Sequence, residues 1–462
     1  MTEPASAISH ELFSVGPRCP EVLALVSSSL EAAAVEHCVL IHSRRGHELV
    51  EIDLAVGPPD IAKAGCVVNA LQRANFRPLQ HFQPRLGEHV IDFASQQEGG
   101  WTLLRLRVIS ACWRGGVLFF SADTVVKNRH RAEGGLFWTA QEGDVLIYLL
   151  ARMMAADDNS QADCASAREL IRKLTHEEAE RILSRAFGPA SAKSILAEIT
   201  APAGNASGPP LPQTLTRMPS RRFAKLRYAI VWLLSRPAAR RYSAGLALVM
   251  LGPDGVGKST LRKNIVERFQ PVLPPLTVWY RPRWVQPRGP GRPLHRPHAN
   301  PVRGPVASIL YLLLVFVDCC FGYLAVGERH LRRPGLLIFD RYFFDLLVDP
   351  KRYRYAGPRW LVRALCSLVP PRRFLMLVLD APPEVMFARK QELPLEELTR
   401  QRNAYSRLTY AEAVTIPTDS SMEACTARAC EAMVDYLARR FQREHRYLFP
   451  STAELTSARA SR

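Results

Sequence analysis

Apolar runs recur in the second half of the chain, separated by segments with helical spacing. The runs are Leu246 to Leu251, Gly335 to Phe339 and Phe374 to Leu379, and an aspartate directly follows each of the last two. Continuous apolar strands that alternate with helices are typical of a parallel sheet with helices on both faces. We therefore predict an α/β fold with three layers, whose ligands bind at the carboxyl ends of the strands.

The first half has a different pattern. Residues 49–56 alternate apolar and acidic positions and predict a strand, and residues 91–93 belong to a second strand. From Gln141 to Ile199 apolar and charged residues recur at helical spacing, which predicts a helical subdomain. We expect a smaller α/β domain with a helical extension over residues 1–200.

Composition marks the domain boundaries. With 462 residues, of which 47% are hydrophobic, the chain is long enough for two or three domains. The segment 201–220, APAGNASGPPLPQTLTRMPS, has the Pro, Gly and Ser content of a flexible linker. A second α/β domain is expected over 221–448. The Ser-, Ala- and Arg-rich residues 449–462 are expected to form a disordered tail.

Two apolar segments raise the question of a membrane. Residues 305–326 are long enough to span a bilayer, but they contain Asp318, so we predict a buried helix instead. Tyr311, Val315, Asp318 and Gly322 fall on one face of that helix, which would place Asp318 in a pocket. Residues 221–234 mix basic and apolar positions, and the open alternatives there are packing on the protein and contact with a membrane surface.

The overall composition is strongly basic, which fits several anionic partners or simply an arginine-rich proteome. A formal charge of +18 suits phosphate-bearing substrates, anionic membranes or nucleic acid. The ten cysteines lack metal-binding spacing and are expected to be reduced, mostly buried thiols. No charged segment with an apolar core opens the chain, so we expect a cytoplasmic protein.

The first apolar run leads into a loop with the chemistry of phosphate binding. Residues 252–260 read GPDGVGKST and are followed by helical spacing from Leu261 to Phe269. Glycines let backbone N–H groups converge on a triphosphate, the lysine neutralises phosphate oxygens and the serine hydroxyl ligates Mg²⁺. The loop therefore predicts a bound nucleoside triphosphate and Mg²⁺. The predicted nucleotide-binding residues are Gly252, Asp254, Gly255, Val256, Gly257, Lys258, Ser259 and Thr260, with Ser259 also a metal ligand.

The other strand ends add charged groups at the same edge. Asp340 and Arg341 follow one strand, where a carboxylate can serve the metal and an arginine can grip a phosphate. Asp380 follows the next strand and is the alternate acid on the metal side. Arg389 opens a basic segment that is suited to a lid over phosphates. The alternatives are a structural salt bridge for the Asp-Arg pair and a solvated helix face for the lid.

These elements together resemble the thymidylate kinase-like family of P-loop kinases over roughly residues 245–442. The resemblance is carried by GPDGVGKST at 252–260, FDRY at 339–342, LDAPPE at 379–384, and the Arg389 lid followed by Tyr405. It implies that Lys258 and Arg389 assist transfer from ATP. It also implies that Asp340 serves Mg²⁺ and Arg341 the acceptor phosphate, so the implied catalytic residues are Lys258, Asp340, Arg341 and Arg389.

A narrower resemblance concerns the acceptor. The stretches DLLVDPKRYRYAGP and RKQELPLEELTRQRNAY look like the thymidylate kinase-like proteins often found with polysaccharide biosynthesis. Family members that act on thymidylate usually carry Arg-Glu-Pro-Gly after the second strand, whereas this chain has Tyr-Arg-Pro-Arg at 280–283. The Pro- and Arg-rich residues 282–303 fall where the acceptor base would be recognised. Specificity for thymidylate is therefore left open.

The first half carries a weaker signal. Glu51, Asp53 and Asp92 are expected to meet across adjacent strands, and paired metals held by such acids support nucleotidyl transfer. His42 and Ser43 stand where the nucleotidyltransferase superfamily has Gly-Ser, so the domain looks like a minimal nucleotidyltransferase. The bulk of His42 would obstruct the approach of a phosphate to the backbone. An active site and an inert or ligand-binding domain both remain open.

Three functions follow from these patterns. The first is an ATP- and Mg²⁺-dependent kinase of a nucleoside monophosphate, with dTMP as the family default. The second is a kinase of a sugar or glycolipid acceptor, and the third is a nucleotide-sensing regulatory protein. We expect a nucleoside monophosphate or another phosphate-accepting substrate as partner and no nucleic acid. A homodimer and a peripheral membrane contact are left open.

Overall fold

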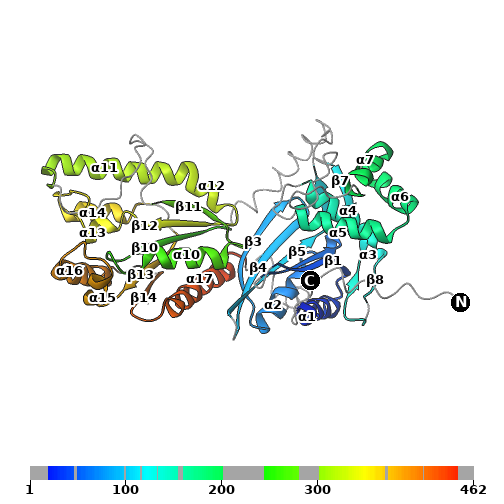
Figure 1. Ribbon diagram of the computed structural model, residues 1–462, viewed down its shortest axis with the longest axis horizontal. Helices are drawn as coiled ribbons and strands as arrows, with labels where there is room; N and C mark the ends of the chain where they lie inside the picture. The colour runs from blue at the N-terminus through cyan, green and yellow to red at the C-terminus, as the bar shows by residue number, and fades with distance from the viewer. Residues whose placement is uncertain are drawn as a thin grey trace, which may run out of the picture. The chain divides into compact units, whose positions relative to one another are not determined.

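The computed structural model divides the chain into two compact units. Unit 1 comprises residues 1–241 with 441–462, and unit 2 comprises residues 242–440. The structure describes residues 19–45, 49–97, 100–114, 117–132, 134–154, 160–200, 244–279, 301–369, 373–408, 410 and 412–445. Both units combine helices with a sheet, which confirms the predicted α/β class (Figure 1).

Unit 2 is built on a five-stranded sheet in which every neighbouring pair is parallel. In spatial order its strands are β11 (Pro275–Trp279), β12 (Leu336–Asp340), β10 (Leu246–Leu251), β13 (Leu375–Asp380) and β14 (Ala413–Pro417). The three apolar runs of the sequence form the three central strands, β12, β10 and β13. They are buried because helices cover the sheet on both faces, as continuous apolar strands require.

Helices account for most of the remaining part of unit 2 that is described. Figure 1 shows α11 on one side of the sheet and α10 with α17 on the other. The helices are α10 (Lys258–Phe269), α11 (Pro305–Gly322), the π-helical turn Tyr323–Gly327, α12 (Glu328–Leu331), α13 (Asp345–Val348), α14 (Arg359–Cys366), α15 (Pro383–Arg389), α16 (Leu395–Ser406) and α17 (Met422–His445), of which residues 422–440 belong to unit 2.

The apolar helix α11 is only partly buried, so the prediction of a buried helix was wrong. One third of its 18 residues are buried, and among the described residues it is the one helix long and apolar enough to cross a membrane. The predicted inner face is confirmed, because Val315, Asp318 and Gly322 are buried. The opposite face and the turn after it expose large apolar side chains, by 36% to 72%: Val306, Leu310, Leu313, Leu314, Val317, Phe321 and Leu324.

Unit 1 contains a seven-stranded mixed sheet. In spatial order the strands are β3 (Arg77–Arg85), β4 (Glu88–Gln97), β5 (Gly100–Ile109), β2 (Leu49–Val56), β1 (His37–Arg45), β9 (Trp138–Thr139) and β8 (His130–Arg131). A separate hairpin is formed by β6 (Ala111–Arg114) and β7 (Val117–Ser121). The predicted strand over residues 49–56 is β2, with the same bounds, and residues 91–93 lie within β4.

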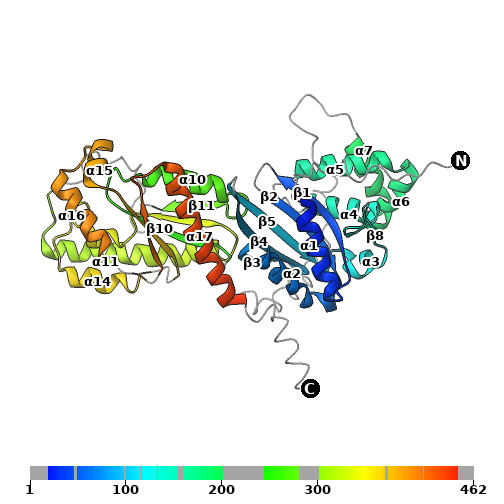
Figure 2. The same ribbon diagram turned by 90° about the horizontal axis from the view of Figure 1, so that it is seen from below.

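The two faces of this sheet differ in chemistry. Apolar residues at alternate positions of β2, β4 and β5 pack against α1 (Cys19–Ala32) and α2 (Cys66–Arg73), which contact each other (Figure 2). Between β2 and α2 lie the short 3₁₀ turns Pro58–Asp60 and Lys63–Gly65. Because side chains alternate along a strand, the intervening positions, which carry the acidic residues, face the other side.

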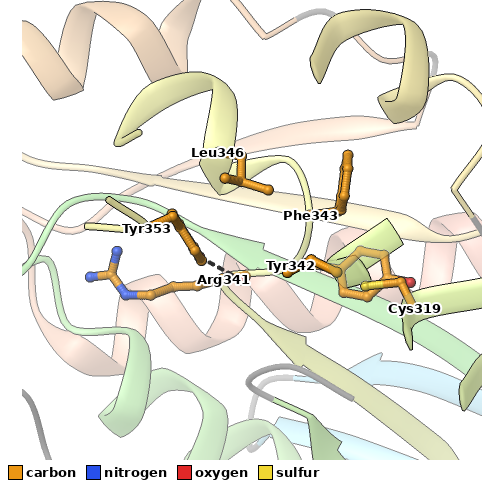
Figure 3. A pocket seen from close by; sticks show the side chains of 7 residues that line it. Cys319, Arg341, Tyr342, Phe343, Leu346 and Tyr353 are labelled. Atoms are coloured by element: carbon orange, nitrogen blue, oxygen red, sulfur yellow. Dashed lines mark hydrogen bonds between the residues drawn. The ribbon is translucent and has the colours of Figure 1, made fainter. Parts of the chain in front are cut away.

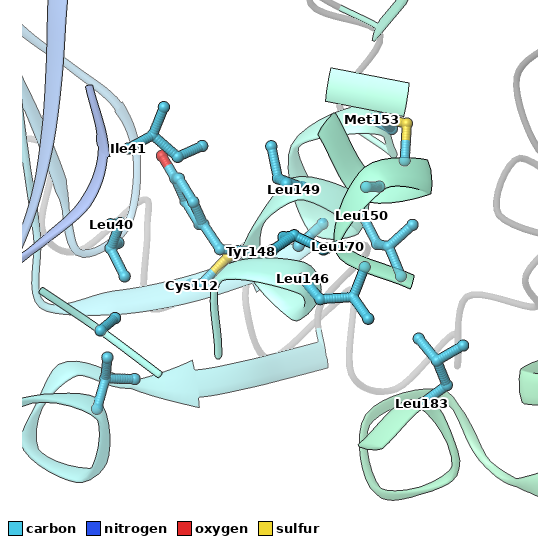
Figure 4. Packing of buried hydrophobic residues seen from close by; sticks show 14 of the residues in the cluster. Leu40, Ile41, Cys112, Leu146, Tyr148, Leu149, Leu150, Met153, Leu170 and Leu183 are labelled. Carbon is cyan, nitrogen blue, oxygen red and sulfur yellow. The ribbon is translucent and has the colours of Figure 1, made fainter. Parts of the chain in front are cut away.

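The predicted helical subdomain is confirmed. It consists of α4 (Glu142–Met153), α5 (Ser160–Lys173), α6 (His176–Phe187) and α7 (Pro189–Thr200), and the shorter α3 (Ala122–Lys127) precedes it. Thr175 and Glu178 form a reciprocal capping box that begins α6. The leucines of α4 to α6 belong to one apolar cluster, into which Tyr148 extends toward Ile41 of β1 (Figure 4).

Several sequence predictions lie outside the described residues. These are the linker 201–220, the amphipathic segment 221–234, the Tyr-Arg-Pro-Arg segment 280–283 and the tail 449–462. They stay predictions, as do the domain boundaries that depend on them. The nine cysteines whose side chains the structure describes are free thiols, most of them buried, as expected.

Two leucines of α11 test how this helix is covered. Leu312 is fully buried and Leu310 is 63% exposed. We expect Leu312→Gln to lower the free energy of unfolding by about 2–5 kcal/mol, because it removes a packed side chain and buries an amide. The matched change Leu310→Gln should alter it by less than about 0.5 kcal/mol. Urea unfolding followed by circular dichroism measures both, and equal losses would contradict the exposed face.

Candidate functional site

The predicted phosphate loop connects the end of β10 to the start of α10, and its backbone requires glycine. Gly252, Gly255 and Gly257 have φ angles of +147°, +81° and +98°, which lie in the range that side chains disfavour. A Cβ at Gly255 would lie 2.5 Å from the backbone oxygen of Met386, and one at Gly252 would lie 2.8 Å from that of Leu379. The glycines therefore allow the loop to pack directly against the backbone of β13 and α15.

Lys258 is the first residue of α10 and lies inside the loop. Its Nζ donates hydrogen bonds to the backbone oxygens of Gly252 at 2.8 Å and Pro253 at 2.7 Å. Burial, followed by the nearby guanidinium of Arg341, lowers the pKa of Lys258 to about 7. The next two residues, Ser259 and Thr260, are exposed on the first turn of the helix, where unpaired backbone N–H groups favour anions.

The parallel register places the other strand ends around this loop. Met250 of β10 is opposite Asp340 of β12, and Leu251 is opposite Val378 of β13. Asp340 is buried, and its Oδ2 pairs with Nη1 of Arg262 on α10 at 3.1 Å. The structure thus brings the predicted acid of β12 to the edge of the sheet that carries the loop.

Arg341 follows Asp340 in the left-handed region, with a φ angle of +55°. Its guanidinium pairs with Asp254 of the loop and, at 3.3 Å, with Asp345. The hydroxyl of Tyr353 lies 3.3 Å from the backbone oxygen of Arg341 (Figure 3). The same hydroxyl lies 3.2 Å from Oδ2 of Asp345. The hydroxyl of Tyr405 donates to the other oxygen of Asp345. Asp345 thereby holds the guanidinium of Arg341 and the hydroxyls of Tyr353 and Tyr405.

A small cavity lies beside this cluster. It is lined by Arg341, Tyr342 and Tyr353 together with apolar residues, and its volume is about 10 Å³. That volume suits one water molecule and no nucleotide. In Figure 3 the guanidinium of Arg341 points away from Cys319 and Tyr342. The guanidinium of Arg341 therefore lies next to the loop and not in the cavity.

Arg352 is the site residue that sequence reasoning missed. Its Nη2 pairs with Oδ2 of Asp254, while its Nε lies 3.2 Å from Oδ2 of Asp349. Asp254 therefore contacts two guanidiniums, one with each oxygen. Burial alone would raise the pKa of Asp254, but the positive charges of Arg341, Lys258 and Arg352 lower it to about 2.

A signal for Arg352 was present in the sequence. The segment Asp349-Pro350-Lys351-Arg352 has the composition of a tight turn, and Asp349 accepts a hydrogen bond from the backbone N–H of Arg352 at 3.2 Å. Such a turn directs the arginine back toward the strand end. The contact with Asp254 joins residues 98 positions apart, so no local pattern could reveal it.

The predicted lid arginine does not contact the loop in this structure. Arg389 ends α15, and its Nη2 donates to the backbone oxygen of Thr418 at 2.9 Å. The neighbouring Lys390 lies closer, because its Cβ would be 3.3 Å from a Cβ at Gly255. The alternate acid Asp380 is held by Arg402 through two contacts, of 2.6 Å and 2.8 Å. Asp380 and Asp340 thus each have an arginine partner.

The residues present suit Mg²⁺ held together with a nucleotide. Magnesium takes few protein ligands and completes its shell with phosphate oxygens and water. Ser259 offers an exposed hydroxyl at the start of α10, and Asp340 offers a carboxylate at the strand end. In the described part of the chain no group of three or more His, Cys, Asp or Glu residues could form an all-protein metal site. A phosphate-dependent site is consistent with both observations.

The predicted cluster of carboxylates in unit 1 was wrong in its geometry. β5 lies between β2 and β4, so Asp92 is not on a strand adjacent to Glu51 and Asp53. The intervening strand contributes arginines: Arg105 pairs with Asp92 at 2.8 Å, and Arg107 with Asp53 at 3.4 Å. The acids therefore lie among positive charges and not around an open metal site.

Asp53 is the centre of this network. Its Oδ2 accepts hydrogen bonds from Arg152 at 2.6 Å and from the Tyr148 hydroxyl at 2.7 Å. Burial alone would raise the pKa of Asp53, but Arg107 and Arg152 outweigh burial and lower it. Arg152 also pairs with Asp163 at 3.0 Å and so ties α4 to α5. His42 and Ser43 lie on β1, but their side chains are outside the described residues.

Comparison with known proteins adds little to these observations. No protein-family model matches the chain, and no curated protein matches it. Among solved structures, it matches the crystal structure of thymidylate kinase from Ehrlichia chaffeensis with 14% sequence identity and a TM-score of 0.30. The match covers 41% of this chain and 99% of that one. The function proposed below rests on the loop and on the charged groups around it.

The close packing of Gly255 generates one prediction. Gly255→Ala should lower the free energy of unfolding by about 1–3 kcal/mol, because the new methyl meets the Met386 backbone at a strained φ angle. A matched control is Gly304→Ala, whose Cβ meets nothing within 4 Å. Thermal unfolding of unit 2, followed by calorimetry, compares the two. An unchanged melting temperature for Gly255→Ala would contradict the packing of the loop.

The charge network of unit 1 generates a further prediction. Arg152→Gln should lower the free energy of unfolding by about 3–5 kcal/mol, since it leaves buried carboxylates without their main partner. The control is Lys193→Gln, which removes a positive charge that is 73% exposed and 3.7 Å from Glu180, and a change below about 0.5 kcal/mol is expected there. Denaturant unfolding measures both. Similar small losses for the two variants would show that the network is not structural.

Proposed function

We propose that unit 2 transfers a phosphoryl group from ATP, with Mg²⁺, to an acceptor that bears a phosphate. The observation that carries the proposal is the glycine loop of residues 252–257, which holds buried Lys258 beside Arg341 at the carboxyl ends of parallel strands. Loop, lysine and arginine are the parts that phosphoryl transfer requires, because that reaction depends on positioning and charge stabilisation.

The donor is proposed to bind at the loop. Positive φ angles at the three glycines leave backbone N–H groups without side chains in front of them. Lys258 is held by two backbone oxygens, which phosphate oxygens would replace as its partners. Bound Mg²⁺ would neutralise charge on the phosphates. Ser259 and Asp340 are the residues proposed to hold it.

The acceptor is proposed to bind on the side of Arg341. A guanidinium that is 12% exposed and held by Asp345 is positioned for a phosphate before the acceptor arrives. A nucleoside monophosphate fits this requirement, and dTMP is the first candidate because of the family resemblance. An unphosphorylated sugar offers no anion to this group, so a sugar kinase is the less favoured alternative. Arg389 is proposed to exchange the Thr418 oxygen for the transferred phosphate.

The test is release of ADP from ATP and Mg²⁺ in the presence of dTMP, other nucleoside monophosphates and a panel of sugars. Lys258→Ala should lower the rate at least about 100-fold, because one charge-stabilising group at the reacting phosphate is lost. The matched control is Lys263→Ala on the same helix, whose side chain is 75% exposed. Its rate should stay within about twofold of the wild type.

Three outcomes separate the candidate functions. Turnover with dTMP or another nucleoside monophosphate supports the proposal. Turnover with sugars alone would replace it by a sugar kinase, and ATP binding without turnover on any acceptor would favour a nucleotide sensor. Normal turnover by a correctly folded Lys258→Ala protein would contradict the role of the loop.

A further inference from the structure

Asp254 is bound in a way that resembles the recognition of a phosphate. Its two carboxylate oxygens contact different guanidiniums, those of Arg341 and Arg352, which lie 87 and 98 positions away in the chain. The aspartate side chain is 11% exposed, and the two arginines are 12% and 16% exposed. Two converging guanidiniums on one small anion form the arrangement that proteins use for phosphate.

Both guanidiniums are held in place by acids other than Asp254. Asp345 pairs with Arg341 at 3.3 Å, and Asp349 pairs with Arg352 at 3.2 Å. Both acids are fully buried, and Asp345 also contacts the hydroxyls of Tyr353 and Tyr405. If Asp254 moved away, the two guanidiniums would therefore keep their positions and present a preformed positive pair.

We propose that Arg352, together with Arg341, binds the phosphate of the acceptor, and that Asp254 occupies this position while the acceptor is absent. The inference rests on the proposed kinase function and extends it to a second arginine and to a class of acceptor. It requires a phosphate monoester, such as a nucleotide or a sugar phosphate, and excludes an acceptor without an anionic group.

The exchange has a simple electrostatic basis. A phosphate monoester carries a charge of about −2 above its second pKa, near 6, and has three terminal oxygens, whereas a carboxylate carries −1 and two oxygens. The acceptor phosphate therefore interacts more strongly with two guanidiniums than Asp254 does. The released carboxylate stays near Lys258 and Lys390, whose positive charges already act on it.

The test uses phenyl phosphate, a monoester with neither base nor sugar, titrated by calorimetry into the full chain saturated with ADP and Mg²⁺. Arg352→Gln should weaken its binding about 10- to 100-fold, the value of a hydrogen bond to a charged group. Arg352→Lys keeps the charge but loses the fork, so an intermediate loss is expected. The matched control is Arg359→Gln, an exposed arginine on α14, which should bind as the wild type does.

Asp254→Asn provides a readout that a purely structural role would not produce. Removing the competing charge should tighten phenyl phosphate binding about three- to tenfold. Because the pKa of Asp254 is about 2, its charge stays constant from pH 5 to pH 8. The variant and the wild type are therefore compared at a single pH, because the lowered pKa of Lys258, about 7, also falls within that range. Titrations with dTMP and with glucose 1-phosphate then distinguish a nucleotide from a sugar phosphate.

Two results would overturn the inference: Arg352→Gln that binds phenyl phosphate within twofold of the wild type, or Asp254→Asn that binds it more weakly. If Arg352→Gln fails to fold, Arg352→Lys and Asp254→Asn decide the question. A failure of the proposed function itself gives a different result. ADP and Mg²⁺ would then fail to bind the wild type, or they would bind Lys258→Ala as tightly as the wild type. In that case phenyl phosphate is titrated without nucleotide into the Arg352 and Asp254 variants, each of which also carries Lys258→Ala.

Discussion

Because β12 and β13 both pair in parallel with β10, the carboxyl ends of the three central strands lie at one edge of the sheet. Every charged group of the candidate site depends on this pairing. It places Asp340 and Arg341 beside a loop that begins 88 residues earlier in the chain, at Gly252. It also brings the backbone at the end of β13 and in α15 so close to the loop that glycine is required at two positions. The sheet thereby determines both the shape of the loop and the groups that face it.

Both units pair buried acidic residues with arginines, but these pairs have different roles in the two units. In unit 1 the buried acids of the sheet are matched by arginines from β5 and α4, and these pairs tie strands to helices. In unit 2 the arginines also have acidic partners, but two of them share Asp254, which lies in the glycine loop. A buried ion pair has a structural role where both of its side chains stay bound to each other. It can be exchanged where a ligand takes the place of one of the two side chains.

Burial gives the loop its electrostatic character. Lys258 is surrounded by protein, so water does not stabilise its charge, and Arg341 adds repulsion. The nearby acids Asp254, Asp340 and Asp345 act in the opposite direction. A group in such a balance responds strongly to an added anion, because few competing water contacts must be broken. The same reasoning applies to the guanidiniums that share Asp254.

Local pattern in the sequence determined the strands β10, β12, β13 and β2, the helical subdomain and the glycine loop between β10 and α10. Apolar periodicity and glycine spacing act over a few residues, so they can be recognised without the fold. The order of strands could not be recognised in this way. The sequence therefore placed Asp92 on a strand adjacent to Asp53, whereas tertiary pairing inserted β5 and its arginines between them.

Tertiary structure alone decided which polar groups meet and which faces are covered. Arg352 reaches Asp254 only because the turn after Asp349 folds back to the strand end, a contact across 98 positions. Likewise, the composition of α11 predicted a buried helix, but only one of its faces packs against other elements of unit 2. Hydrophobicity identifies the side chains whose burial lowers the free energy of the folded state. Packing against other elements determines which of these side chains are actually buried.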